Sequence, residues 1–458
     1  MLCLCGLRRA ARREAASAAT RLRRAGVLAP HAPAADPSRV EPAPGEAEAV
    51  AGRHTLRSSL RLRAVELPAR LAASGVAALR GALLRLPGAN AVVESGPSTR
   101  RLLLDERSSR DPLPSCVAAF LPGGAAYPLL EPGESVSLVR HVFERTYDSF
   151  SSSEALSALL PPSIAPPSSF EEAGHVIHLN LREEQRPWGR LIGSVLLDKQ
   201  PRCRTVVTKR GSLTGPFRTF DFELLAGEAR YVATIREGEL LFTVDVSQVY
   251  WNSRLATERR RLVGRFSPGE GVVDIACGAG PIALAAARKG CSVWACDANP
   301  AAVAACSANA RANRVVLPAP PFCGDGADFA RLLLSAAPPP EVHHVVCNLP
   351  QSAPELLGRA LRGAFATWPK ERELPFVHAY AFSKADDPRG DILARLAASL
   401  GVDAAALGRR VEWSDVRDVA PGKRMLRATF RLPWDAADPE RAAKGAPRDD
   451  DAASDCMS

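Results

Sequence analysis

A glycine-containing stretch, DIACGAGP, joins a short apolar run to a helix-like run, and Asp274 begins it. Gly278 and Gly280 allow the backbone to approach a ligand closely where a strand ends. A second acid, Asp297, ends the next apolar run, where a carboxylate can accept hydrogen bonds from both hydroxyls of a ribose. Because a proline follows Gly280 and no third glycine is present, the turn is not a dinucleotide fingerprint. The pattern favours S-adenosylmethionine over NAD, with an ordinary strand–turn–helix connection as the alternative.

The stretch VHHVVCNLPQSA ends an apolar strand in an amide, an apolar residue and a proline. Asn348 offers one carbonyl acceptor and two N–H donors, and Pro350 fixes the turn. Asp325, in CGDGADF, follows another strand-like run, so polar groups end several strands of one sheet edge. His343 and His344 lie inside the strand and are expected to pack rather than to act as bases. With the glycine turn, these residues suggest methyl transfer to a planar nitrogen.

The elements that must position these residues alternate between strand and helix from Gly271 onward, which predicts a doubly wound α/β domain. Asn299 and Pro300 provide an N-cap and a first helical residue, and Gly290 ends the preceding helix. Upstream, the pattern of residues 175–252 predicts a strand-rich α+β unit in which LIGSVLLDK is a strand. A hairpin with a Glu-Gly turn is also expected there. The run LRAVELPARLAASGVAALRGALLRL predicts one or two helices.

The composition is that of a multi-domain globular protein of 458 residues, with 46% hydrophobic residues and no apolar run of about 18 residues. The net charge of +9 is compatible with a polyanionic partner and equally with heavy arginine usage throughout the chain. Eleven scattered cysteines, without a CxxC pair or zinc-type spacing, favour a reducing compartment and predict no metal site.

The first 35 residues contain seven arginines and a single acid, Glu14, on a helix-like spacing with an Ala/Leu face. This start is typical of a mitochondrial transit peptide, and a disordered basic leader is the alternative. We therefore expect a mitochondrial matrix protein, with nuclear and cytoplasmic pools also compatible. The expected domains are a disordered leader (1–58), a poorly defined N-terminal domain (59–165), an α+β middle domain (166–260), a Rossmann-like domain (261–435) and a disordered tail (436–458).

Eight ordered blocks carry a family resemblance over roughly residues 174–433. They are GHVIHLNLREEQ, LIGSVLLDK, FRTFDFELLAGE, VYWNSRLATERRRLV, DIACGAGPIALAA, CDANP, CNLPQSA and VRDVAPGKRMLRATF. Together they resemble the Trm5 family of tRNA (guanine-37, N1) methyltransferases, in its eukaryotic branch. The resemblance implies a small N-terminal domain, a middle domain that cradles the anticodon stem, and a Rossmann-like class I methyltransferase domain. It also implies a monomer that acts on tRNA with guanine at position 37, without a membrane partner.

The resemblance assigns roles to individual residues. Glu258 is similar to the family's general base, although a helix-surface acid paired with Arg261 is the alternative. Arg218 matches an arginine that stabilises the guanine O6, with a phosphate contact to tRNA as the alternative. Arg254 resembles an arginine that shapes the site. The implied catalytic residues are Glu258, Arg218, Arg254, Asn348 and Pro350, and the implied S-adenosylmethionine contacts are Arg259, Asp274, Gly278, Gly280, Asp297, Ala298, Asp325, Gly326 and Asn348.

The chain departs from the family pattern at two aromatic positions around the glycine turn. Ala276-Cys277 and Ile282 stand there, so aromatic surface beside the cofactor is reduced. Two rival functions remain open. One is a wybutosine-pathway aminocarboxypropyl transferase with the same cofactor, in which the NLP and RLATE segments typically differ. The other is a non-catalytic tRNA-binding scaffold, against which Glu258, Asp297 and Asn348 argue.

Overall fold

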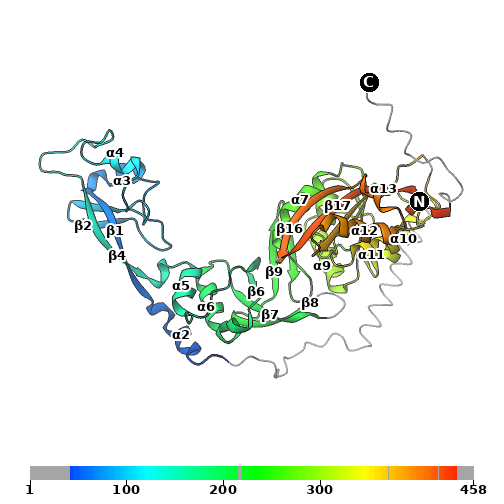
Figure 1. Ribbon diagram of the computed structural model, residues 1–458, viewed down its shortest axis with the longest axis horizontal. Coiled ribbons are helices and arrows are strands. Elements are labelled where there is room, and N and C mark those ends of the chain that lie inside the picture. The colour runs from blue at the N-terminus through cyan, green and yellow to red at the C-terminus, as the bar shows by residue number, and fades with distance from the viewer. Residues whose placement is uncertain (1–41, 215–218, 370, 421, 441–458) are drawn as a thin grey trace.

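The computed structural model describes residues 42–214, 219–369, 371–420 and 422–440, arranged as three sheet-containing units along an open arc (Figure 1). A small N-terminal sheet occupies one end of the arc, a middle unit lies at its bend, and the largest sheet lies at the other end. Arg218, most of the leader (1–41) and most of the tail (441–458) fall outside the described residues. The domain bounds given above stay predictions.

The N-terminal unit is an antiparallel sheet where the sequence pattern predicted helices. Its strand order is β2 (Val92–Gly96), β3 (Thr99–Leu103), β1 (Arg57–Pro68) and β4 (Ser137–Thr146), accompanied by α3 (Ala72–Ala78) and α4 (Ser115–Phe120). Over residues 62–68 the prediction of helix was wrong, because β1 buries alternate residues on two faces, whereas farther along the same stretch α3 is helical as predicted. Leu62 and Ala64 pack in one apolar cluster, whereas Val65 and Leu67 pack in another.

The middle unit contains a helix where a strand was expected. Its sheet has the order β5 (Glu171–Ala173), β6 (Val176–Leu179), β7 (Thr205–Thr214) and β8 (Thr219–Gly227), covered by α5 (Ser152–Leu159) and α6 (Gly189–Lys199). The segment LIGSVLLDK lies within α6, so the strand prediction was wrong. Its apolar residues Leu191, Ile192, Val195 and Leu196 recur with the helical period and all enter one core cluster.

The segment that precedes β1 contains a helix, α2 (Glu46–Gly52). Glu46 is buried, and its carboxylate accepts hydrogen bonds from the backbone N–H groups of Arg190 (2.7 Å) and Leu191 (3.2 Å). These amides belong to the first turn of α6, where backbone donors lack helical partners and a negative charge is favourable. The side chain of Glu46 therefore joins this segment to the middle unit.

The predicted hairpin is confirmed as β9 (Val232–Glu237) and β10 (Leu240–Asp245), with Gly238 in the left-handed conformation at its turn. It packs on α9 (Pro300–Ala312) through two asparagines. The side-chain Oδ1 of Asn309 accepts from the Thr243 N–H (2.8 Å), and the side-chain Oδ1 of Asn313 accepts from the Leu241 N–H (2.9 Å). The hairpin is thereby attached to the large sheet unit.

The large unit is the predicted doubly wound α/β domain. Its strand order is β13 (Phe322–Cys323), β12 (Ser292–Asp297), β11 (Gly271–Asp274), β14 (His344–Cys347), β15 (Phe376–Ser383), β17 (Lys423–Arg431) and β16 (Glu412–Ala420). The first five strands are parallel, and β17 is antiparallel to both its neighbours. One face carries α7 (Ala256–Gly264), α8 (Pro281–Arg288) and α9; the other carries α10 (Gly326–Leu334), α11 (Ala353–Leu361) and α12 (Pro388–Leu400).

Two local details of this domain follow the sequence signals. The Asn299 side chain caps α9 with Pro300 at its first position, and Gly290 follows α8 with a positive φ of 103°. The short α13 (Ala404–Gly408) and α14 (Trp434–Ala437) complete the unit. Ala436 and Ala437 are fully buried in the core, so the expected tail begins with two core residues.

Candidate active site

The glycine turn after β11 is held to the end of β12 by Asp297. The Gly278 N–H donates to one carboxylate oxygen of Asp297 (2.8 Å), and the Asn299 N–H donates to the other (2.9 Å). Gly278 and Gly280 both have positive φ, at 56° and 90°. Two parallel strands thus end beside one another, with their connecting loops joined by a carboxylate.

The two glycines of this turn have different surroundings. A Cβ placed on Gly278 would have no atom within 4 Å, so this part of the backbone faces open space. A Cβ placed on Gly280 would lie 2.7 Å from the Cys306 sulfur, so that glycine permits close packing on α9. An open backbone cradle beside a strand-end carboxylate is suited to an adenosyl ligand, and the residues present therefore fit S-adenosylmethionine.

Three acids surround this turn in different electrostatic states. Burial and the nearby Asp297 charge raise the pKa of Asp274 to about 7, and burial also raises the pKa of Asp297. Asp325 caps α10, accepting from Ala327 N–H (2.8 Å), and pairs with Arg359 (2.8 Å). Although burial opposes it, hydrogen bonding from Arg359 and the helix amides lowers the pKa of Asp325. The three carboxyl groups around the turn therefore differ in how readily they ionise.

Two neighbours of these acids also lie at the carboxyl edge of the sheet. Ala298 is exposed directly after Asp297. Gly326 follows Asp325, and a Cβ there would lie only 2.3 Å from the Ile275 carbonyl oxygen, so glycine lets the α10 start approach the β11 loop. The predicted cofactor residues of β11, β12, β13 and β14 are thus brought to one edge, as parallel strands require.

The NLP segment ends β14 at the same edge. Asn348 is half-buried, and Pro350 is buried with its carbonyl oxygen accepting from the Phe382 N–H on β15 (2.9 Å). The parallel register pairs Cys347 with Ala379, so Asn348 follows at the level of Tyr380. The proline therefore ties the turn to β15 and leaves Asn348 at the strand end.

Glu258 lies on α7, only 6% exposed, against the face formed by β15 and β17. Its Oε1 accepts hydrogen bonds from the Tyr380 hydroxyl (3.1 Å) and from Nη1 of Arg427 (2.6 Å), which is 1% exposed. Its Oε2 is buried and accepts no hydrogen bond from the described residues, although Nη1 of Arg261 lies 3.3 Å away. The expected Arg261 pair is present, but Glu258 is not a surface residue. One oxygen is fixed, and the other can accept a proton.

The two other predicted arginines that the structure describes, Arg254 and Arg259, form no ion pair or hydrogen bond with Glu258. Arg259 is buried on α7 and forms an ion pair with Glu237 on the hairpin. Its Nε donates a hydrogen bond of 2.7 Å to Oε1 of Glu237. Its Nη1 also donates to the Asn252 carbonyl oxygen (3.2 Å). In the described residues Arg259 thus connects α7 to β9, and its cofactor contact stays a prediction. The role of Arg218 also stays a prediction.

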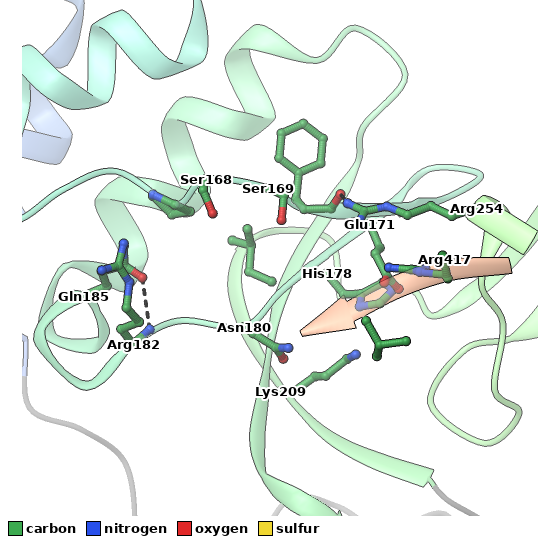
Figure 2. Close-up of a pocket in the computed structure, with 14 residues that line it drawn as sticks. Ser168, Ser169, Glu171, His178, Asn180, Arg182, Gln185, Lys209, Arg254 and Arg417 are labelled. Carbon is green, nitrogen blue, oxygen red and sulfur yellow. Dashed lines mark hydrogen bonds and ion pairs between the residues drawn. The ribbon is translucent and has the colours of Figure 1, made fainter. Parts of the chain in front are cut away.

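Arg254 lines a separate cavity of about 320 Å3 between the middle sheet and β16 (Figure 2). Its Nη2 donates to the Phe170 carbonyl oxygen (2.9 Å). Neither Gly278 nor Asp297 contributes to the lining. The cavity is therefore distinct from the glycine turn.

The sequence interpretation missed three side chains that organise the site. Tyr380 and Arg427 hold Glu258, and buried Asn309 donates to the Ala279 carbonyl oxygen (3.2 Å) while accepting from the hairpin. Arg427 had a signal, since a lone arginine interrupts the apolar run MLRATF of a central strand. Tyr380 and Asn309 stand among ordinary core residues, so no comparable signal marked them.

No helix in the described part of the chain has the length and apolar character needed to cross a membrane. The same residues contain no group of three or more His, Cys, Asp or Glu side chains able to hold a metal ion.

Comparisons with known proteins connect this site to a family. Residues 233–386 match the TRM5/TYW2 methyltransferase domain, and residues 153–230 match the TYW2 N-terminal domain. A Danio rerio tRNA (guanine(37)-N(1))-methyltransferase is 37% identical over 400 residues, covering 83% of this chain and 81% of that protein. A Vitis vinifera protein, tRNA (guanine(37)-N(1))-methyltransferase 1, is 40% identical over 342 residues, covering 73% of this chain and 55% of its own length. This chain therefore spans about half of the plant relative and most of the fish relative.

Solved structures share the fold. Trm5b from Pyrococcus abyssi has a TM-score of 0.55 at 23% identity, covering 81% of this chain and 99% of that chain. A structure described as the complex of aTrm5 and tRNALeu has a TM-score of 0.52 at 20% identity, with the same coverage. The fold is that of a class I methyltransferase preceded by an α+β unit, and the methyl donor of such an enzyme is S-adenosylmethionine. The chain belongs to the Trm5 family of tRNA (guanine-37, N1) methyltransferases, in its eukaryotic branch.

Proposed function

We propose that this protein methylates N1 of guanine 37 in tRNA, next to the anticodon, and thereby supports maintenance of the reading frame. The observation that carries the proposal is the position of Glu258, buried beside Tyr380 at the level of Asn348. S-adenosylmethionine, when bound, supplies an electrophilic methyl group on a sulfonium. Its binding residues would be the carboxyl-edge set, namely Asp274, Gly278, Gly280, Asp297, Ala298, Asp325, Gly326 and Asn348, with Arg259 as a further candidate.

The reaction requires a base because guanine N1 carries a proton in the neutral nucleotide. Glu258 Oε2 would accept that proton, so that the N1 electron pair can bond to the methyl carbon while the carbon–sulfur bond breaks and leaves its electron pair on sulfur. Tyr380 and Arg427 hold Oε1 throughout, which fixes the direction of Oε2. Asn348 and Pro350 shape the strand end that faces the acceptor, and Arg254 helps to shape the site. Arg218 would stabilise negative charge developing on guanine O6, or alternatively contact a tRNA phosphate.

The substrate and the setting are part of the same proposal. The relatives' names support tRNA with guanine 37 as the substrate, and the net charge of +9 suits a polyanion. We propose a monomer without a membrane partner. The arginine-rich start supports a mitochondrial matrix location, with nuclear and cytoplasmic pools in addition.

Transfer of labelled methyl to tRNA transcripts tests the proposal. We expect label on a transcript with guanine 37 and loss of label when adenine replaces it. Glu258→Gln should abolish most transfer, whereas Glu355→Gln, an exposed glutamate on α11, should not. Robust transfer by Glu258→Gln would exclude this residue as the base. The mass of the modified nucleoside distinguishes a methyl from an aminocarboxypropyl product, and absence of any transfer alongside tRNA binding would indicate a scaffold.

A further inference from the structure

Four basic side chains from distant parts of the chain line the cavity shown in Figure 2, and three of them, Lys209, Arg254 and Arg417, lie toward one end of it. Arg182 follows β6, Lys209 lies on β7, Arg254 lies in the 3-10 turn Ser253–Leu255, and Arg417 lies on β16. Gathering like charges in one cavity costs Coulomb energy. The convergence therefore points to an anionic ligand.

The cavity lining neutralises only part of this charge. Its single carboxylate is Glu171, which lies 3.2 Å from Nε2 of His178. Arg254 donates to the Phe170 carbonyl oxygen, and Nε of Arg417 donates to the Asp418 carbonyl oxygen (3.3 Å). Among the described residues neither guanidinium is within ion-pair distance of a carboxylate. Two arginine forks consequently keep donors for a ligand.

Lys209 is a further basic side chain of the lining. Burial lowers the pKa of Lys209, and the nearby Glu171 charge only partly opposes this effect. An anion in the cavity would compensate the dehydrated ammonium. Uncharged donors are also present, since the Ser168 and Ser169 hydroxyls and the Asn180 amide line the same space. Arginine forks with hydroxyl and amide donors match the oxygens of a phosphate group.

The location identifies which phosphate would bind. Arg254 precedes Glu258 by one helical turn. Arg417 pairs in the sheet with Met425, two residues from Arg427, which holds Glu258. The cavity therefore adjoins the candidate base, and its volume of about 320 Å3 accommodates a phosphate with part of its sugar. We infer that this cavity binds a backbone phosphodiester next to the target guanine, which rests on the proposed function.

Chemical neutralisation of single phosphates tests the inference. Short RNA stem-loops would carry one methylphosphonate at a time at the linkages flanking guanine 37, and binding to the full chain would be measured by filter retention. We expect one linkage whose neutralisation weakens wild-type binding about tenfold. The Arg417→Gln variant should bind the natural RNA about tenfold more weakly than wild type does. Its affinity should fall little further with that methylphosphonate, because the substitution and the methylphosphonate remove the same contact.

Salt dependence and a matched variant complete the test. The slope of log K against log salt should fall by about 0.7–1 for Arg417→Gln. Arg409→Gln, an exposed arginine at the end of α13, should keep both affinity and slope. S-adenosylmethionine affinity, measured by calorimetry, should be unchanged in both variants.

Two outcomes would overturn the inference. One is equal binding losses for Arg417→Gln and Arg409→Gln with no sensitive linkage. The other is that inorganic phosphate binds weakly to wild type and not to Arg417→Gln, while no methylphosphonate changes RNA binding. That result would show that the cavity binds a free anion rather than the RNA backbone. Because these measurements need no methyl transfer, an inactive wild-type enzyme that binds RNA through the sensitive linkage would refute the proposed function alone.

Discussion

Replacement of Arg427 by methionine should destabilise the large α/β unit strongly. Arg427 is 1% exposed, Glu258 is 6% exposed, and the atoms that join them are 2.6 Å apart. The methionine would leave a buried carboxylate with one hydroxyl donor and the more exposed Arg261. Removal of one partner of a buried pair costs about 3–5 kcal/mol. At about 2–4 °C per kcal/mol for a unit of this size, the melting temperature should fall by about 6–20 °C.

Thermal unfolding of matched variants separates this effect from a general loss of charge. Arg431→Met lies on the same strand, where Arg431 pairs with Glu373, whose side chain is 80% exposed. That change should cost at most about 1 kcal/mol. The double variant Arg427→Met/Glu258→Gln should recover much of the stability, because the uncompensated charge is gone. Equal melting temperatures for Arg427→Met and Arg431→Met would refute this account of the Glu258 environment.

Three further changes follow from the glycine turn and its neighbours. The pKa of Asp274 is raised from 3.8 to about 7, so the protonated side chain contributes stability below about pH 4, and this contribution is lost as pH rises through about 7. In urea titrations, Asp274→Asn should therefore become more stable relative to wild type as pH rises over that window. A difference in stability that does not change with pH would contradict this expectation. Both Gly278→Ala and Gly280→Ala should cost about 1–2 kcal/mol because the backbone is left-handed at each position. Gly280→Ala should cost more, because its Cβ would also clash with Cys306, and Cys306→Ala should restore stability to the Gly280→Ala variant only. Asn309→Ala should cost about 1–3 kcal/mol in urea unfolding by leaving the Thr243 N–H and Ala279 carbonyl oxygen unpaired, whereas the exposed Arg311→Ala on the same helix should not.

Short sequence signals correctly predicted those features that depend on residues close together in the chain. The Asn299 cap, the Gly290 helix end and the Gly238 turn depend on residues within a few positions, and each is found as expected. The doubly wound order of the strands followed from their alternation with helices. By contrast, α6 and β1 were mispredicted, because short apolar runs suit either period until the core that covers them is known.

The surroundings of Glu258 could not be predicted from its own segment. The Tyr380 hydroxyl is 122 residues away in sequence, and the Arg427 guanidinium is 169 residues away. The pairing of β15 with β17 and the packing of α7 bring them together, and no spacing rule encodes that contact. The same holds for Arg254 and Arg417, whose shared cavity depends on how β16 lies beside the middle sheet.

The contact between Glu46 and the start of α6 sets a limit for N-terminal truncation of this protein. Removal of the arginine-rich start upstream of Ala43 leaves intact both the Glu46 carboxylate and the hydrogen bond from the Ala43 N–H to the Pro187 carbonyl oxygen (2.8 Å). A cut beyond Glu46 would instead expose the first amides of α6 and the apolar surface that α2 covers. A truncated chain should therefore begin upstream of this helix for the middle unit to keep its stability.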